Sequence, residues 1–337
     1  MDSQNVSHQA SFRITFPEVA MSTFDVRVVK KVVEADGIVS LELRAVGDET
    51  LPAFSAGSHI DMHLPNGLVR QYSLCNAPGD SGRYIVAVLR APNSRGGSAA
   101  VHETVAVGDI LGISGPKNHF ALLPAPRSIL IGGGIGVTPL LSMADALYAS
   151  GADFELHYCA RSESRMAFRE KLQNSPFSER VKFYFDDRGD LIEKNELLGA
   201  PTVEVHLYVC GPAGFIEFLT TTAKRLGWAD RNIHFEFFAA PSTSNEGDSA
   251  PFQIEIASTG ARLDVTTGRS AADVLHEHGF EIPLSCEQGV CGTCMTRVIA
   301  GTPDHRDMFL TDEERISNET FMPCCSRSLS PILVLDL

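Results

Sequence analysis

The sequence has little positive charge and no long apolar segment. It contains 28 Lys and Arg residues against 42 Asp and Glu residues, so its formal net charge is −14 at pH 7. This balance argues against nucleic-acid binding, which depends on basic side chains. No apolar run reaches the roughly 20 residues of a membrane-spanning helix, and the first residues lack the layout of a secretory signal. We expect a cytoplasmic protein whose acidic surface is either simply solvated or docks a partner that presents basic groups.

Signatures of disulfide bonds and of hydrolases are also missing. Of the eight cysteines, four belong to a metal-binding pattern and the others show no paired spacing. No convincing combination of Ser, His and Asp suggests a hydrolase. At 337 residues, with 44% hydrophobic residues, the chain is long enough for two or three globular domains.

The most specific motif is a set of four cysteines: Cys286, Cys291, Cys294 and Cys324. The spacing C-x4-C-x2-C with a distant fourth cysteine is the plant-type arrangement for a [2Fe–2S] cluster, in which each iron takes two thiolates. Zinc sites favour two comparable C-x2-C pairs, whereas the second half here offers only the adjacent Cys324 and Cys325. Gly289 and Gly292 lack a Cβ atom and let the backbone approach the sulfides. We predict a cluster that relays single electrons.

The pattern of apolar residues divides the chain into regions. About six short runs of alternating apolar and polar residues indicate an antiparallel barrel. From Ser128 onward, fully apolar runs alternate with helical segments, which is typical of a parallel sheet covered on both faces. Ser270 is expected to cap a helix that runs to His278. We predict an N-terminal extension (1–21), a β-barrel (22–123), a doubly wound α/β nucleotide-binding domain (124–238), a linker (239–251) and a cluster domain (252–337), with Met21 as an alternative start.

A motif in the predicted barrel combines a cation, an aromatic ring and a hydroxyl: Arg70-Gln71-Tyr72-Ser73-Leu74. A flavin can use such a set, because Arg pairs with phosphate, Tyr stacks on the ring and Ser hydrogen-bonds the reactive edge. Strand alternation places Arg70 and Tyr72 on one face and Ser73 on the other, so the strand must end or twist there. The alternative is that these are ordinary surface and rim residues.

A second phosphate-binding candidate follows Arg95 in the same domain. Gly96, Gly97 and Ser98 precede a helical pattern and offer backbone amides and a hydroxyl to an anion. An ordinary surface turn is the alternative interpretation.

A glycine loop follows the buried strand near Ser128. Gly133, Gly134 and Gly136 lead into a helix that Thr138 is predicted to cap and that has Pro139 in its first turn. Amides at such a helix start bind anions, here a dinucleotide pyrophosphate. The spacing differs from G-x-G-x-x-G because Pro139 takes the last place, so this fingerprint alone leaves the question open.

Cys210, Gly211 and Pro212 mark another strand end that turns sharply into a helix. Ligands of open α/β sheets lie outside the carboxyl ends of strands, which is where Cys210 is expected. The alternative for Cys210 is a buried small apolar side chain.

Two weaker candidates complete the set. Asp186 and Asp187 end a strand and are candidates for ribose hydroxyls, although acidic residues are common in turns. His59 and His63 share a strand face, where rim or packing roles are more typical than metal ligation.

The order of these motifs resembles the phthalate dioxygenase reductase family, which includes vanillate demethylase reductases. The resemblance covers almost the whole chain beyond residue 21. It implies FMN in the barrel, NADH on the α/β domain and a plant-type cluster in a C-terminal β-grasp (α+β) ferredoxin domain. The barrel motif with Gly96, Gly97 and Ser98 is similar to the FMN form of the family rather than to relatives with FAD.

The resemblance also implies roles for single residues. Arg70, Tyr72 and Ser73 correspond to the flavin contacts. The pyrophosphate loop corresponds to Gly134, Gly136 and Thr138. The implied catalytic residues are Ser73, Cys210 beside the nicotinamide, and Phe238, an aromatic residue near the flavin, for which Phe237 is the alternative. A Cys-x-Ser-Arg pattern favours Cys324 over Cys325 as the fourth cluster ligand.

Electron counting and the resemblance together predict the function. NADH delivers two electrons as a hydride, the cluster accepts one at a time, and a flavin can do both. The implied acceptor is the Rieske centre of a non-haem iron oxygenase that acts on an aromatic acid or a similar small molecule. We expect the reductase to be a monomer. The alternatives are a reductase for a cytochrome P450 or another acceptor, and a redox-binding protein without turnover. Arg161 and Arg165 leave NADPH open as the electron donor.

Overall fold

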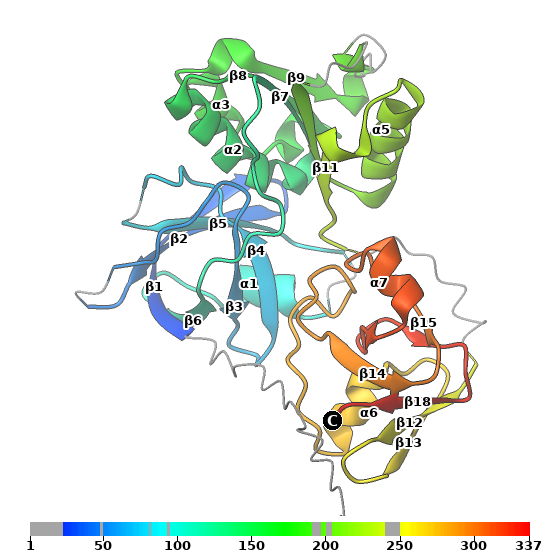
Figure 1. Cartoon of the computed structure of the whole chain (residues 1–337). Helices are drawn as coiled ribbons and strands as arrows, with labels where there is room; N and C mark the ends of the chain where they lie inside the picture. Colours follow the sequence, from blue (N-terminus) through cyan, green and yellow to red (C-terminus); the bar gives the residue numbers. More distant parts are fainter. Residues whose placement is uncertain are drawn as a thin grey trace, which may run out of the picture.

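The computed structural model describes residues 23–47, 50–80, 82–92, 95–190, 197–199, 204–239 and 250–337. The predicted N-terminal extension and most of the predicted linker lie outside these residues. Figure 1 shows three domains, with the barrel in the middle, the α/β domain above it and the C-terminal domain below. Within the described part of the chain, no helix is both long and apolar enough to cross a membrane.

The first domain is a six-stranded antiparallel sheet of order β4-β3-β6-β1-β2-β5. Its strands are β1 (Thr23–Ala35), β2 (Ile38–Ala45), β3 (His59–His63), β4 (Val69–Ser73), β5 (Tyr84–Leu89) and β6 (Ile110–Ser114). A bridge between Leu74 and Val86 joins the two edges, β4 and β5, so the sheet curls into a barrel. Alternate apolar residues such as Val26 and Val28 fill it, as the period-two pattern predicts. One short helix, α1 (Gly97–Glu103), follows β5.

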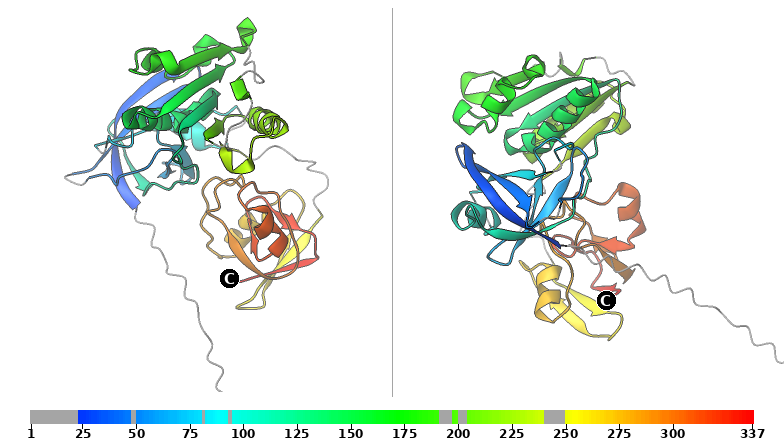
Figure 2. Two further views of the ribbon diagram at one scale, coloured as in Figure 1. Left: turned by 45° about the horizontal axis from the view of Figure 1, so that its top comes forward. Right: turned by 90° about the vertical axis from the view of Figure 1, so that its left-hand side faces the viewer.

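The second domain has a parallel sheet of order β11-β10-β7-β8-β9. Its strands are β7 (Arg127–Gly133), β8 (Asp153–Ala160), β9 (Val181–Phe185), β10 (Val205–Cys210) and β11 (Ile233–Glu236). The α-helices are α2 (Val137–Ser150), α3 (Arg169–Gln173) and α5 (Ala213–Arg225), and the short 3-10 helices are η1 (Gly134–Gly136), η2 (Glu163–Arg165), η3 (Ser178–Arg180), η4 (Asp186–Arg188) and η5 (Asp230–Asn232). Helices α2 and α5 cover opposite faces of the sheet (Figure 2). This is the predicted doubly wound arrangement.

The third domain is a mixed sheet of order β13-β12-β18-β14-β16 with a separate β15-β17 pair. Its elements are β12 (Phe252–Ile256), β13 (Arg262–Val265), α6 (Ala271–Glu277), β14 (Thr296–Ala300), β15 (Pro303–Asp304), α7 (Asp312–Ser317), β16 (Thr320–Phe321), β17 (Arg327–Ser328) and β18 (Ile332–Leu335). Ser270 caps α6 through a capping box with Asp273, and His278 is the C-cap, so that helix prediction is confirmed. With α6 packed on the sheet, the domain has the predicted β-grasp character.

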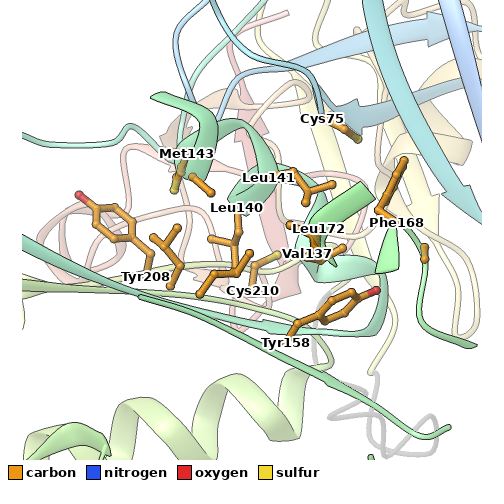
Figure 3. Close-up of a cluster of buried hydrophobic side chains, with 14 of the residues drawn as sticks. Cys75, Val137, Leu140, Leu141, Met143, Tyr158, Phe168, Leu172, Tyr208 and Cys210 are labelled. Atoms are coloured by element: carbon orange, nitrogen blue, oxygen red, sulfur yellow. The ribbon is translucent and has the colours of Figure 1, made fainter. Parts of the chain in front are cut away.

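The barrel and the α/β domain share one apolar core. Leu141 and Met143 of α2 lie in the same buried cluster as Cys75 and Phe120 of the barrel. Figure 3 shows Cys75 approaching the helix residues of this cluster. Burial of this shared apolar surface joins the first two domains firmly.

Candidate active site

A cavity of about 370 Å³ lies where the three domains meet. Its volume falls in the range of small-molecule and cofactor sites. Its wall includes Arg70, Gln71, Tyr72 and Ser73 of β4, Glu236, Phe237 and Phe238 at the end of β11, and Cys286 and Cys291 of the cysteine loop. A molecule bound in the cavity would therefore contact all three domains.

The β4 motif reaches the cavity from both faces of the strand. Strand β4 stops at Ser73, and Ser73 lines the cavity together with Arg70, Gln71 and Tyr72 despite the alternation of faces. Leu74 differs, because its side chain is fully buried in the barrel core. Leu74, the last residue of the predicted motif, is thus not among the residues that line the cavity, because its apolar side chain points into the barrel.

Arg70 is paired with the cysteine loop of the third domain. Its guanidinium donates to both carboxylate oxygens of Glu287, at 3.0 and 3.1 Å, and to the Ser285 carbonyl at 3.0 Å. The sequence predicts a phosphate partner for this cation. In the structure, Arg70 lines the cavity and at the same time contacts the cluster domain.

The start of α1 forms another part of the wall. Gly97 and Ser98 line the cavity, whereas Gly96 precedes the helix in a left-handed conformation and is not among the lining residues. A Cβ atom on Gly97 would lie 2.7 Å from Cγ of Arg70. Glycine at this position therefore lets the arginine lie against the helix.

His59 lies deeper in the site than the sequence indicates. It pairs with Ser73 across strands β3 and β4, is 5% exposed and lines the cavity. Its Nε2 atom is buried and has no hydrogen-bond partner among the described residues. Burial is the main cause that lowers the pKa of His59 to about 4, with the neighbouring His119 next, so the ring is neutral at pH 7. A bound molecule with a hydrogen-bonding group would satisfy this atom.

The glycine loop and the Cys210 turn contact each other at the carboxyl ends of the adjacent strands β7 and β10. A Cβ atom on Gly136 would lie 2.3 Å from the Cys210 carbonyl oxygen, and one on Gly211 would lie 3.1 Å from Cα of Gly133. The predicted cap is wrong: Gly136 is the N-cap of α2, and Thr138 lies inside the helix. The Thr138 hydroxyl donates to the Ile135 carbonyl at 2.9 Å. A threonine hydroxyl in a helix can reach the carbonyl oxygen of the preceding turn in this way.

Cys210 is fully buried and does not line the cavity, but its neighbour in the next strand does. Glu236 pairs with Cys210 across β10 and β11, and its Oε2 atom is buried without a partner among the described residues. Burial raises the pKa of Glu236 to about 8. Burial, followed by the nearby Glu236, raises the pKa of the Cys210 thiol. Sequence reasoning missed Glu236 because nothing local marks an acidic residue in a strand as functional.

Of two other predicted residues, Phe238 lies at the cavity and Asp186 does not. Phe238 lines the cavity and packs against the core that the barrel shares with the α/β domain. Phe237 also lines the cavity, and its ring meets Phe235 edge-on at 5.5 Å. Asp186 lies in η4 after the edge strand β9, is exposed, and is not brought to the cavity.

The four predicted cluster ligands come together as two pairs. The thiols of Cys286 and Cys291 lie close enough to shift each other's pKa, and so do those of Cys294 and Cys324. Two thiolates for each of two irons is the arrangement that a [2Fe–2S] cluster needs. Among the described residues, no group of three or more His, Cys, Asp or Glu side chains could hold a single metal ion. The pairwise arrangement therefore fits a two-iron cluster.

The glycines of the cysteine loop are required by close contacts. Gly289 and Gly292 both have φ of 71°. A Cβ atom on Gly289 would lie 2.4 Å from the Cys325 sulfur, and one on Gly292 would lie 2.3 Å from the ring of Phe309. Glycine at both positions therefore lets the loop fold tightly against its neighbours.

Comparison with known proteins identifies the family. Residues 254–329 match the 2Fe-2S iron-sulfur cluster binding domain. The chain is 49% identical over 316 residues to a vanillate O-demethylase oxidoreductase from Pseudomonas putida, covering 93% of this chain and 99% of that protein. It is 37% identical over 315 residues to a phthalate 4,5-dioxygenase oxygenase reductase subunit from the same species, covering 92% and 96%.

Solved structures agree. A phthalate dioxygenase reductase, described as a modular structure for electron transfer from pyridine nucleotides to [2Fe-2S], matches with a TM-score of 0.77 and 35% identity, covering 94% of this chain and 98% of that one. An intact type IV self-sufficient cytochrome P450 monooxygenase matches with a TM-score of 0.77 and 36% identity, covering 94% of this chain but 41% of that one. The chain therefore belongs to the phthalate dioxygenase reductase family, as the order of its motifs predicts.

Proposed function

We propose that the protein passes electrons from NADH through FMN and a [2Fe–2S] cluster to the terminal component of a Rieske-type non-haem iron oxygenase that acts on an aromatic acid. One observation carries the proposal: a single cavity is lined by the β4 motif, by the end of β11 and by two cysteines of the cluster loop. A bound flavin supplies the conversion of a two-electron hydride transfer into single-electron transfers. The chain's own residues bind and orient the three redox groups.

The barrel residues hold the FMN in this proposal. Tyr72 and Ser73 contact the flavin ring, and Gly97 and Ser98 lie at its phosphate. The unpartnered atoms of His59 and Glu236 support the fit, because both face a cavity that lacks other partners for them among the described residues.

The α/β domain holds NADH. We assign its pyrophosphate to the glycine loop of Gly133, Gly134, Gly136 and Thr138, and its nicotinamide to the turn of Cys210, Gly211 and Pro212 with Phe238 nearby. The contact between loop and turn supports one continuous nucleotide site. Asp186 remains a candidate for the ribose hydroxyls, outside the cavity.

The cluster domain holds the iron. We assign Cys286 and Cys291 to one iron and Cys294 and Cys324 to the other, supported by their pairing. Cys324 is preferred to Cys325, whose sulfur lies 3.8 Å from the Met322 carbonyl oxygen and 3.7 Å from the Ser326 hydroxyl.

The visible spectrum of the purified protein, before and after anaerobic addition of NADH, tests the function. We expect flavin and iron–sulfur bands that bleach with NADH, and FMN released on denaturation. A protein without flavin, or one that NADH does not bleach, would sink the proposal and favour a redox-binding protein without turnover.

A reductase for a cytochrome P450 is the second candidate, because the chain also matches part of a self-sufficient P450 monooxygenase. Coupled assays separate the two: electron delivery to a Rieske oxygenase but not to a P450 supports the first proposal.

We also propose that the protein is a monomer and that it is located in the cytoplasm. The eight cysteines, all within the described residues, form no disulfide bond, which suits a reducing compartment. Sedimentation of the purified protein tests whether it is a monomer.

A further inference from the structure

Three consecutive residues of the cysteine loop, Ser285, Cys286 and Glu287, are held by the barrel. The Ser285 hydroxyl donates to Oδ1 of Asp61 at 2.8 Å. Arg95 donates to the carbonyl oxygens of Cys286 and Glu287, at 2.8 and 2.9 Å. Arg70 completes the set, which we call the loop clamp, through its bidentate contact with Glu287 and its hydrogen bond to the Ser285 carbonyl at 3.0 Å. The clamp thus holds Cys286, a predicted cluster ligand, together with the residues before and after it in the sequence.

One barrel residue of the clamp, Asp61, is held by several hydrogen bonds. Asp61 is 1% exposed and also accepts hydrogen bonds from Gln71 at 3.0 Å and from Lys117 at 2.6 Å. Its backbone amide donates to the Ser114 hydroxyl at 2.9 Å. A buried carboxylate with this many partners has little freedom to move. The Ser285 hydroxyl is therefore anchored to a fixed point of the barrel.

The loop side of the clamp is held in an unfavourable backbone conformation. Glu287 has a φ of 53°, in the left-handed region that favours glycine. Such a residue keeps its conformation only where surrounding contacts impose it, and these positions cluster at functional sites. Here the contacts are the ion pair with Arg70 and the backbone hydrogen bond from Arg95.

In the part of the chain that the structure describes, no shared apolar core joins the barrel to the third domain. Among the described residues, the buried apolar clusters of the third domain contain no barrel residue. One ring contact, between His119 and Phe309 at 5.7 Å, supplements the polar ones. The position of the cysteine loop at the cavity therefore depends largely on the loop clamp.

We propose that the loop clamp sets the rate of electron transfer from flavin to cluster, with Asp61, Ser285 and Glu287 as positioning residues. The proposal rests on the proposed function. Each transfer removes one electron from the reduced flavin and adds one to the oxidised cluster, with no covalent bond made or broken. Because transfer depends on how closely the two groups are held, loosening the loop slows this step alone.

Two substitutions in the full-length protein, Ser285→Ala and Glu287→Ala, test the clamp singly and together. Glu255→Ala is the matched control, because Glu255 pairs with Arg262 at 2.8 Å on the surface of the same domain. Stopped-flow absorbance separates flavin reduction by NADH from cluster reduction. Hydrogen exchange of residues 285–291 reports the loop without any electron transfer.

We expect flavin reduction and cluster content to stay as in the wild type, and cluster reduction in the double variant to slow by about tenfold or more. Exchange in the loop should rise in the clamp variants but not in the control. Unchanged exchange, or unchanged cluster reduction with faster exchange, would overturn the proposal. A wild-type protein that NADH cannot reduce would instead refute the proposed function, and with it the role of the clamp in electron transfer. The hydrogen-exchange measurement would still decide whether the clamp holds the loop.

Discussion

Two polar residues, Glu236 and His59, reach the cavity with a buried atom that has no hydrogen-bond partner among the described residues. A buried polar atom without a partner costs free energy in the folded protein. Each side chain is therefore expected to gain a partner when the cavity is filled, and each makes a prediction for a single substitution.

Glu236 should make stability depend on pH. Its pKa is raised from 4.5 to about 8, so the folded protein holds a proton that the unfolded chain releases in this interval. Stability should therefore fall as pH rises from about 4.5 to about 8, by at most roughly 5 kcal/mol. Glu236→Gln cannot ionise and should lose this dependence. Thermal unfolding of both proteins across the interval measures it, and parallel profiles would contradict the assignment.

His59 should contribute to flavin affinity. His59→Leu removes the buried Nε2 atom, and the loss of one hydrogen bond should weaken FMN binding by about threefold to tenfold. Quenching of flavin fluorescence gives the dissociation constant. His63→Leu is the control, since His63 lies at the end of the same strand, is exposed and does not line the cavity. Equal effects of the two substitutions would argue against a contact between His59 and the flavin.

Among the structural elements, the glycine loop before α2 tolerates no side chain at Gly136. In Gly136→Ala the new methyl group would lie 2.3 Å from the Cys210 carbonyl, so η1 must move away from the end of β10. We expect a stability loss of about 1–3 kcal/mol and slower flavin reduction by NADH. Unfolding and stopped-flow measurements report the two effects.

Gly214 offers the matched control for this change. It lies in the first turn of α5, where an added Cβ atom meets nothing within 4 Å. Alanine is favoured over glycine in a helix, so Gly214→Ala should be neutral or slightly stabilising. A Gly136→Ala protein that behaves like Gly214→Ala would show that the loop is not packed against Cys210 as described.

At the scale of the whole molecule, the net charge of −14 should govern encounters with acceptors. Electron transfer to the basic protein cytochrome c should slow as salt is added, because screening weakens the attraction over the Debye length. Transfer to anionic ferricyanide should speed up under the same conditions. Initial rates over a salt series test this, and trends of the same sign for both acceptors would exclude electrostatic steering by the acidic surface.

Local patterns in the sequence were sufficient for much of the fold and for the cluster site. The cysteine spacing, the alternation of β1 and the Ser270 capping box depend on residues a few positions apart, so neighbouring residues determine them. Thr138 shows the limit even at this range, because the short helix η1 precedes α2 and the N-cap is Gly136.

Only the tertiary structure decided which residues share the cavity. Arg70 meets Glu287, which lies 217 positions further along the chain, and His59 and Glu236 reach the same space from different domains. The sequence determined the elements and the order of the domains, because these depend on local periodicity and spacing. The cysteine spacing also predicts the cluster ligands, with Cys324 chosen through the family resemblance. The clamp and the unpartnered polar atoms arise from contacts between distant segments, which exist only once the three domains have packed together.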